Sequence, residues 1–377
     1  MNAKAVNTNK MGHRFLIAGG GTGGHLFPGI AIAQEVMTRS PKNKVLFVSS
    51  GKPFEKDILS KNGFKHITIS SGGIKRLSLQ QQFRSAIKIP KGILQSVFIL
   101  KTFKPSIVIG VGSYSAGPVV IGAWLMRIIV VLHEQNTIPG ITNRILSYFA
   151  KRIYISFEDT KQRLKSRKVY YTGNPVRKGF LEQAALSNRT HKNSSDKKDL
   201  FTILILGGSQ GAHALNMAVI ESLTHLKDNG NFYFIHQTGV QDEREVKHAY
   251  QSLNISSVIQ AFFDDMVQQY KQADLVICRS GATTVAEITA MGKSAIFVPY
   301  PFAADNHQAV NAKSLANIGA AEMILEKDLC TKLLTRRIEY YASHPDALSL
   351  MAAKAKQMGR PEAAKIIVDD CLRLLNT

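Results

Sequence analysis

The chain has 377 residues, of which 45% are hydrophobic and 20% are charged, so it is long enough for two domains with ordinary cores. Its 48 Lys and Arg outnumber its 27 Asp and Glu, for a formal net charge of +21. This excess favours anionic partners such as phosphorylated substrates, nucleic acid or an acidic membrane surface. The scattered Cys278, Cys330 and Cys371 argue against a disulfide framework or a cysteine metal site and indicate a reducing compartment.

Neither a signal peptide nor a membrane span is expected. The N-terminus is polar, and glycines break the first apolar run after only a few residues, which is too short for a signal peptide. The longest apolar stretch, 118–132, is interrupted by Arg127, whereas a helix needs roughly 20 apolar residues to span a bilayer.

The first half of the chain alternates short β-rich runs with helical patterns. Near-continuous apolar strands separated by helices indicate a parallel sheet that is covered on both faces. The expected strands are FLIAG (15–19), KVLFVSS (44–50), HITIS (66–70), SIVIGVG (106–112), IIVVLHE (128–134) and RIYISF (152–157).

The same pattern restarts after a polar, basic stretch at 187–199, which is typical of a solvated loop near a domain boundary. Strand, glycine turn and helix follow at 201–223, and further strands are expected within 232–239, 256–263, 275–280, 294–300 and 320–326. The sequence therefore predicts an α/β protein with two doubly wound, Rossmann-like domains at 1–175 and 176–360. A C-terminal helix at 361–377 could pack on either domain, and a ligand crevice should lie between the domains at the carboxyl ends of the strands.

The first glycine turn, IAGGGTGGHLFPGIA at 17–31, contains the dinucleotide fingerprint G-x-G-x-x-G at Gly19, Gly21 and Gly24. That fingerprint also expects a carboxylate about 20 residues later, at the end of the second strand. The second strand ends in Ser-Ser-Gly-Lys instead, which weakens the dinucleotide interpretation but leaves an NADP-dependent oxidoreductase open. His25, directly after the glycines, could cap the helix or face the crevice.

Two further turns are suited to phosphate. The turn at 207–212, GGSQGA, allows a ligand to approach the backbone closely and precedes a helix whose N-terminus favours anions. In CRSGATTVAE (278–287), Ser280 is a good N-cap residue, and the small residues after it leave the helix start open. Glu287 could bind both hydroxyls of a ribose, or it could simply complement the helix dipole.

Three polar clusters follow expected strands. They are His133–Asn136, Asn174–Arg177 and Asp305–Gln308, and each could be an ordinary polar loop or part of the site. No D-x-D sequence occurs, so we expect a sugar–nucleotide site that needs no metal ion, and no cofactor is predicted.

The joint order of these motifs resembles the MurG family of peptidoglycan N-acetylglucosaminyltransferases. The resemblance covers nearly the whole chain from Arg14 and rests on GGGTGGHLFP, GSYSAGP, HEQN, GNPVR, GGSQGA, FFDDM, CRSGATTVAE and the cluster at 305–308. It implies the GT-B fold and inverting transfer of N-acetylglucosamine from UDP to the muramyl 4-hydroxyl of lipid I, which gives lipid II. The N-terminal domain would then face the acceptor and the membrane, and the C-terminal domain would bind the UDP-sugar.

The resemblance also implies site residues. His25 is the first choice for the general base, with Glu134 and Asp305 as alternatives, and the first glycine loop would face the lipid-linked diphosphate. Phe263 replaces a smaller aliphatic residue whose backbone faces uracil, and Ala286 replaces a common Ser. The implied substrate contacts are Thr22, Gly23, Gly24, Asn136, Arg177, Ser209, Phe263, Ala282, Thr283, Thr284, Val285, Ala286, Glu287 and Gln308.

Bulky apolar and basic residues alternate around Pro90, which should interrupt or open a helix. The pattern is typical of an amphipathic surface, but a lipid-linked substrate favours peripheral contact with an anionic membrane. The expected contacts are Phe83, Arg84, Ile87, Lys88, Lys91 and Ile93. The resemblance implies the cytoplasmic face of the bacterial inner membrane, a role in cell-wall synthesis, shape and division, and partner proteins from those processes.

A non-enzymatic nucleic-acid or membrane binder is the second alternative. Such a protein would need basic residues interleaved with stacking aromatics, yet the single Trp, Trp124, falls in an apolar helical pattern. We therefore expect no nucleic-acid partner.

Overall fold

The computed structural model describes residues 12–70, 79–164, 166–187, 200–208, 211–227 and 229–377, with only the backbone at 79–89, 183–187 and 229. The chain divides into two compact units. Unit 1 comprises Met1–Gln135, Pro139–Arg177 and Glu362–Thr377, and unit 2 comprises Asn136–Ile138 and Lys178–Pro361.

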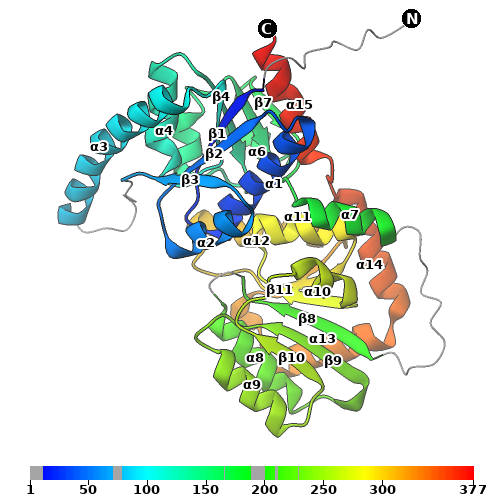
Figure 1. Ribbon diagram of the computed structural model, residues 1–377. Helices are drawn as coiled ribbons and strands as arrows, with labels where there is room; N and C mark the ends of the chain where they lie inside the picture. Colours follow the sequence, from blue (N-terminus) through cyan, green and yellow to red (C-terminus); the bar gives the residue numbers. More distant parts are fainter. Residues whose placement is uncertain (1–11, 71–78, 165, 188–199, 209–210, 228) are drawn as a thin grey trace, which may run out of the picture. The chain divides into compact units, whose positions relative to one another are not determined.

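Unit 1 is built on a seven-stranded, wholly parallel sheet with the strand order β3-β2-β1-β4-β5-β6-β7. The neighbouring strands β3, β2 and β1 are labelled in Figure 1. The strands are parallel because a helix follows most of them in the sequence, and each such helix crosses one face of the sheet to bring the chain back to the same end. The elements are β1 (Arg14–Ala18), α1 (Gly23–Arg39), β2 (Lys44–Ser49), α2 (Pro53–Lys61), β3 (Lys65–Thr68), α3 (Leu79–Phe103), β4 (Ile107–Gly110), α4 (Ala116–Leu125), β5 (Ile129–Glu134), α5 (Ile141–Leu146), β6 (Arg152–Ile155), α6 (Thr160–Leu164), β7 (Val169–Tyr171) and α15 (Ala363–Leu375).

Successive residues of β1 enter different cores. Phe15 and Ile17 pack with side chains of α1, α2 and α15, whereas Leu16 and Ala18 pack with side chains of α3 and α4. All four residues are fully buried, as the two-residue period of a strand requires when helices cover both faces of a sheet.

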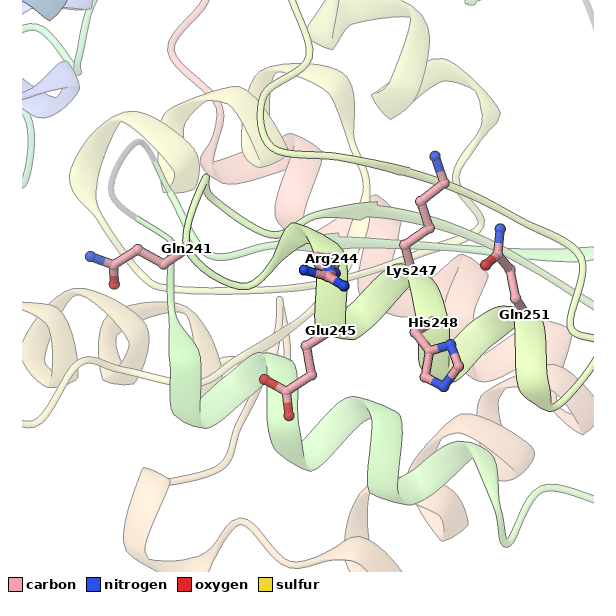
Figure 2. Close-up of a pocket in the computed structure, with 6 residues that line it drawn as sticks. All are labelled: Gln241, Arg244, Glu245, Lys247, His248 and Gln251. Atoms are coloured by element: carbon pink, nitrogen blue, oxygen red, sulfur yellow. The ribbon is translucent and has the colours of Figure 1, made fainter.

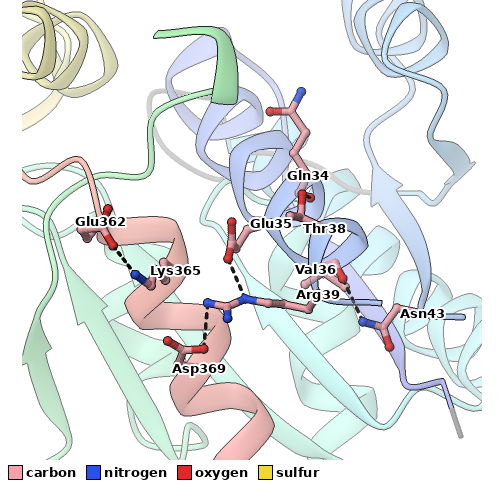
Figure 3. Close-up of polar contacts among 9 residues, drawn as sticks. All are labelled: Gln34, Glu35, Val36, Thr38, Arg39, Asn43, Glu362, Lys365 and Asp369. Carbon is pink, nitrogen blue, oxygen red and sulfur yellow. Dashed lines mark hydrogen bonds and ion pairs between the residues drawn. The ribbon is translucent and has the colours of Figure 1, made fainter. Parts of the chain in front are cut away.

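The C-terminal helix α15 belongs to unit 1. Ile367, Val368 and Cys371 are fully buried in the same core as Ile30 of α1. At the rim, the Arg39 guanidinium pairs with Glu35 at 2.7 Å and with Asp369 of α15 at 2.8 Å (Figure 3). These pairs are partly exposed, so burial of the apolar face of α15 contributes most of the stability of this contact.

Unit 2 repeats the architecture with a six-stranded parallel sheet in the order β10-β9-β8-β11-β12-β13. Ile203 and Ile277 pack on one face with side chains of α8, α9 and α13. The elements are α7 (Lys178–Ser187), β8 (Phe201–Leu206), α8 (His213–Leu223), η1 (Asn229–Asn231), β9 (Phe232–Gln237), α9 (Glu243–Ser252), β10 (Ser257–Gln260), α10 (Met266–Gln272), β11 (Leu275–Cys278), α11 (Ala282–Met291), β12 (Ser294–Phe297), η2 (Ala304–Asn306), α12 (His307–Ala316), β13 (Glu322–Met323), η3 (Glu326–Asp328), α13 (Thr331–Ser343) and α14 (Pro345–Met358).

The expected pair of doubly wound, Rossmann-like domains is confirmed. One local prediction is wrong: Pro90 neither opens nor interrupts α3, which continues on both sides of it. Packing of α3 against α4 offsets the hydrogen bond that an interior proline removes. No helix among the described residues is long and apolar enough to cross a bilayer.

Candidate functional site

In unit 1, the strand order reverses between β1 and β4. The helices that follow these neighbouring strands, α1 and α4, pack in the two opposite cores. Such a switch point opens a crevice outside the carboxyl ends of the strands, where α/β proteins bind ligands. The first glycine loop and the loop at 111–115 flank this point, so the sequence motifs lie where the topology places a site.

The first glycine loop is fixed by a carboxylate that the sequence analysis did not single out. Gly19, Gly20 and Gly21 all have positive φ, a conformation that only glycine adopts without strain. The fully buried Glu55 accepts hydrogen bonds from the Gly21 amide and, at 2.9 Å, from the Lys52 amide. Glu55 lies three residues after the N-cap Lys52 of α2, a spacing that local capping chemistry could have revealed.

His25, in the first turn of α1, is held by one ring nitrogen. Its Nδ1 lies 3.0 Å from the Val111 carbonyl oxygen and 2.9 Å from Gln135 Oε1. The ring rests directly against Gly112 (φ +88°), where a Cβ would come within 2.9 Å of the imidazole. Glycine at 112 is therefore needed both for the backbone conformation and for the close approach of His25.

The predicted polar cluster at the end of β5 is buried rather than open to solvent. His133, Glu134 and Gln135 are each at most 1% exposed. Glu134 Oε2 accepts from the Gly140 amide at 3.0 Å and from Asn143 Nδ2 at 2.9 Å. Glu134 therefore ties the loop before α5 to the strand end, and it stands at the same sheet edge as His25.

Burial lowers the pKa of His133 to about 4, because a charged imidazole would lose its hydration there. Its Nδ1 lies 3.1 Å from Gln135 Nε2, and its Nε2 lies 3.4 Å from the Gly173 carbonyl oxygen. Gln135 therefore touches both histidines, a connection that the sequence analysis did not foresee.

The segment after β7 returns to this edge. The Arg177 guanidinium carbon lies 4.2 Å from the centre of the Phe27 ring of α1. Asn174 is 5% exposed, and neither polar atom of its side-chain amide has a hydrogen-bond partner among the described residues. A buried amide without partners costs free energy. Asn174 is therefore, with Arg177, a second polar residue in the segment that returns to this sheet edge.

Unit 2 has its own switch point between β8 and β11. The second glycine turn follows β8, with positive φ at Gly208 and Gly211. Ser209, one of the predicted contacts, lies outside the described residues. The turn after β11 leads directly into α11, so the two phosphate-type turns predicted for this half flank one switch point.

The start of α11 differs from the prediction. Gly281, not Ser280, is the N-cap residue, and no side chain caps the helix. The Ser280 hydroxyl instead donates to the Gln308 carbonyl at 2.9 Å, which removes it from the helix start. Arg279, which the sequence analysis did not select, donates to the Val298 carbonyl at 3.0 Å and pairs with Glu326.

Glu287 lies on the buried side of α11 and is 7% exposed. The hydroxyl of the fully buried Tyr270 donates to Glu287 Oε2 at 3.4 Å. Burial, and next the Glu287 carboxylate, raise the pKa of the Cys278 thiol at the end of β11. Glu287 is therefore a buried carboxylate beside the strand end.

Three other predicted residues of unit 2 follow β10 and β12: Phe263 lies in the loop before α10, Asp305 in η2 and Gln308 in the first turn of α12. The Phe263 amide donates to Gln237 Oε1 at 3.2 Å, and the Tyr300 amide donates to Gln308 Oε1 at 3.0 Å. Asp305 is exposed, with positive φ.

Asn136 is held by Asn311, which was not predicted. The fully buried Asn311 donates through Nδ2 to Asn136 Oδ1 and to the Ser280 carbonyl, each at 3.3 Å. Its Oδ1 accepts from the Thr137 hydroxyl at 2.9 Å. Asn311 therefore anchors the Asn136–Ile138 segment within unit 2, next to the start of α11.

A surface pocket over α9 contains none of the predicted residues. Figure 2 shows its lining side chains splaying apart, with Lys247 and Gln251 on one side of the helix and Glu245 and His248 on the other. Its polar groups do not converge on one point, as a ligand site would require. Within the described ranges, no group of three or more His, Cys, Asp and Glu side chains is placed to hold a metal ion.

Comparison with known proteins defines the class. The chain matches the glycosyltransferase family 28 N-terminal domain over residues 15–155 and the family's C-terminal domain over residues 202–367. Two Rossmann-like domains of this kind form the GT-B glycosyltransferase fold. The chain belongs to glycosyltransferase family 28.

Two curated relatives are UDP-N-acetylglucosamine–N-acetylmuramyl-(pentapeptide) pyrophosphoryl-undecaprenol N-acetylglucosamine transferases. The protein from Syntrophus aciditrophicus is 43% identical over 96% of this chain and 99% of its own length. The protein from Geotalea uraniireducens is 42% identical over 96% of this chain and 98% of its own length.

Among solved structures, Acinetobacter baumannii MurG has a TM-score of 0.73 and 31% identity, and the match covers 95% of this chain and 98% of that chain. The resemblance to the MurG family is confirmed, and these findings support the glycosyltransferase, not the two alternatives. UDP-GlcNAc 2-epimerase from Neisseria meningitidis, with a TM-score of 0.66 and 16% identity over 96% of this chain and 99% of that chain, shares the fold.

Proposed function

We propose that the chain transfers N-acetylglucosamine from UDP-N-acetylglucosamine to the muramyl 4-hydroxyl of lipid I, with inversion at the anomeric carbon, to give lipid II. The observation that carries the proposal is the 43% identity over 96% of the chain to relatives named for this reaction. The two switch points, each flanked by a glycine turn, support it because both substrates carry a diphosphate.

In a single displacement, the acceptor hydroxyl oxygen bonds to the anomeric carbon while the bond from that carbon to the UDP oxygen breaks. The hydroxyl proton must pass to a base. We assign that role to His25, because the contacts of its Nδ1 with a carbonyl oxygen and an amide oxygen leave Nε2 as the basic nitrogen of the neutral ring. A positioned base of this kind contributes typically 10²–10⁴-fold to the rate.

We assign the binding of the UDP-sugar donor to unit 2. The uncapped start of α11 offers its dipole to the diphosphate, which gains negative charge as UDP leaves. Glu287 is assigned the ribose hydroxyls, and the backbone at Phe263 is assigned the uracil. Asn136 and Gln308 are also assigned to the donor, with the Asn136 side chain oriented by its bond from Asn311. Arg177, in unit 1, stays a predicted substrate contact.

We also assign unit 1 a peripheral membrane surface. Leu94 and Phe98 of α3 are each 72% exposed, and Tyr148, just after α5, is 83% exposed. The helix spacing places Lys91, Leu94, Phe98 and Lys101 on one face of α3. Exposed apolar side chains bordered by lysines suit an anionic bilayer, and Trp124 at the end of the adjacent α4 is 49% exposed.

Side chains of the predicted Phe83, Arg84, Ile87 and Lys88 lie outside the described residues, whereas Lys91 is exposed and Ile93 is half-buried. The described part of α3 therefore extends the predicted surface toward Leu94 and Phe98. Membrane contact at the cytoplasmic face would bring the enzyme to its lipid-linked acceptor.

The test is incubation of the purified chain with radiolabelled UDP-N-acetylglucosamine and a short-chain lipid I analogue. We expect a labelled disaccharide lipid with a β linkage, and no such product when UDP-glucose replaces the donor. Unchanged acceptor after incubation with both substrates, in a folded protein that binds UDP, would overturn the proposed activity.

A further inference from the structure

Val111 and Gln135 together surround the Nδ1 atom of His25 with oxygen atoms. The Val111 carbonyl can only accept, so at 3.0 Å from Nδ1 it requires the proton of His25 to be on Nδ1. Gln135 Oε1, at 2.9 Å, is a second acceptor for the same proton. The lone pair of the neutral ring therefore lies on Nε2.

The orientation of the Gln135 amide is fixed independently. Its nitrogen lies 2.9 Å from the Val111 carbonyl and 3.4 Å from the His133 carbonyl, and both of these oxygens can only accept. The NH₂ group must therefore face them, so Oε1 faces His25. Gln135 is 1% exposed, and a buried amide with both ends occupied has little freedom to turn.

His133 completes the arrangement. Gln135 Nε2 also lies 3.1 Å from His133 Nδ1, which must therefore accept, and this places the His133 proton on Nε2, facing the Gly173 carbonyl at 3.4 Å. A protonated His133 would turn a second donor toward Gln135. Its burial, which lowers its pKa to about 4, keeps the ring neutral at neutral pH.

We propose that Gln135 is a positioning residue that holds His25 in the Nδ1–H tautomer, with neutral His133 fixing the Gln135 amide from the other side. The proposal rests on the role of His25 as base given above. When Nε2 receives the acceptor proton, the imidazolium keeps its Nδ1–H bonded to two oxygens, and such bonds strengthen when the donor is charged. The neutral Gln135 amide thus holds the tautomer of His25 and stabilises its imidazolium, which is the role of the carboxylate in a Ser-His-Asp triad.

The first experiment reads the tautomers without any turnover. Long-range ¹H–¹⁵N correlation spectra of ¹⁵N-histidine-labelled protein distinguish the two neutral forms of each ring, with the His25→Ala variant used for assignment. We expect Nδ1–H at His25 and Nε2–H at His133 at neutral pH. The Nε2–H form at His25, or a charged His133, would overturn the proposal whatever the enzyme's activity.

The second experiment compares Gln135→Leu with Gln135→Glu. The Leu variant removes an acceptor from the charged imidazole, so we expect kcat to fall roughly 10- to 100-fold with an unchanged donor KM. The acid limb of its kcat profile should move to lower pH. The Glu variant offers a carboxylate to the imidazolium, so its acid limb should move to higher pH.

Opposite displacements of the acid limb cannot arise from a general loss of stability, which thermal unfolding of both variants measures separately. The control is Gln34→Leu, on the helix α1 that carries His25, and it should leave the pH profile of kcat unchanged. If His25→Ala abolishes turnover but both Gln135 variants keep the wild-type profile, the positioning role fails and the proposed function stands. The titratable groups that contacts place at this edge, all retained in the variants, are His133, Glu134, Glu55, Lys52 and Arg177.

Discussion

The two nitrogens of His25 have different surroundings, and this difference leads to a prediction about turnover. Nδ1 is engaged by Val111 and Gln135, so only Nε2 can act as a base. His25→Ala should lower kcat by about 10²–10⁴-fold while UDP-N-acetylglucosamine binding in the folded variant changes less than twofold. Pre-steady-state turnover and calorimetric titration measure the two effects. A variant with normal turnover would remove His25 from the chemistry.

Glu287 gives a second prediction about a single residue. A carboxylate that accepts from the ribose hydroxyls would contribute about 1.5–3 kcal/mol per bond. Glu287→Ala should therefore raise the UDP dissociation constant at least about tenfold and narrow the preference for UDP over its 2′-deoxy analogue.

The matched control for Glu287 is Tyr270→Phe. It removes the hydroxyl that donates to the carboxylate at 3.4 Å but leaves the carboxylate in place, so UDP affinity should stay near the wild-type value. If Glu287 only supported the packing of α11, both variants would lose thermal stability and neither would change nucleotide affinity. Calorimetry with both nucleotides separates these outcomes.

Helix α3 supports a prediction at the scale of an element. Reversing Arg84, Lys88 and Lys91 to Glu should weaken sedimentation with anionic liposomes, because each basic residue near the bilayer contributes about 1 kcal/mol. Removing three such contributions should lower partitioning by at least roughly 100-fold.

Net charge alone could produce part of that effect in a +21 protein. The control therefore makes the same change of charge in unit 2, with Arg244, Lys247 and Lys271 reversed to Glu, all of which are exposed. We expect this control to bind liposomes nearly as well as the wild type. Equal losses in both variants would mean that overall charge, rather than α3, directs membrane binding.

At the scale of the whole molecule, each unit contains a fully buried histidine at a strand end. Burial lowers the pKa of His133 in unit 1 to about 4 and that of His236 in unit 2 to about 3. The unfolded chain, with histidine pKa values near 6.5, therefore binds protons that the folded chain excludes. The stabilisation from each neutral imidazole is fully present above pH 6.5 and is lost progressively as the pH falls toward the folded-state pKa.

We expect the free energy of unfolding to fall between pH 6.5 and pH 5 by up to about 1.4 kcal/mol per pH unit per histidine. Urea unfolding at pH 7.5, 6.0 and 5.0 measures this slope. His236→Gln should be less stable at pH 7.5 but should depend less on pH, whereas His225→Gln, at an exposed position, should behave like the wild type. Parallel slopes in all three proteins would contradict the prediction.

Much of this architecture follows from the sequence because it depends on neighbouring residues. The strands are short apolar runs between turn residues, and among the strands of the described residues only the three-residue β7 of unit 1 was not predicted. Glycine turns at 19–21 and 207–211 are readable because other residues are strained at positive φ. The order of motifs likewise identified the family, since that order is a property of the chain itself.

Tertiary structure decided the contacts that make the site specific. Gln135 meets His25 across 110 positions of the chain, and Asn311 meets Thr137 across 174. The neighbouring residues predicted Ser280 as an N-cap, but its hydroxyl donates a hydrogen bond to the Gln308 carbonyl instead. These contacts depend on which strand ends lie side by side in the parallel sheet. A buried polar group must form hydrogen bonds with the groups that pack next to it, and those groups are distant in the sequence.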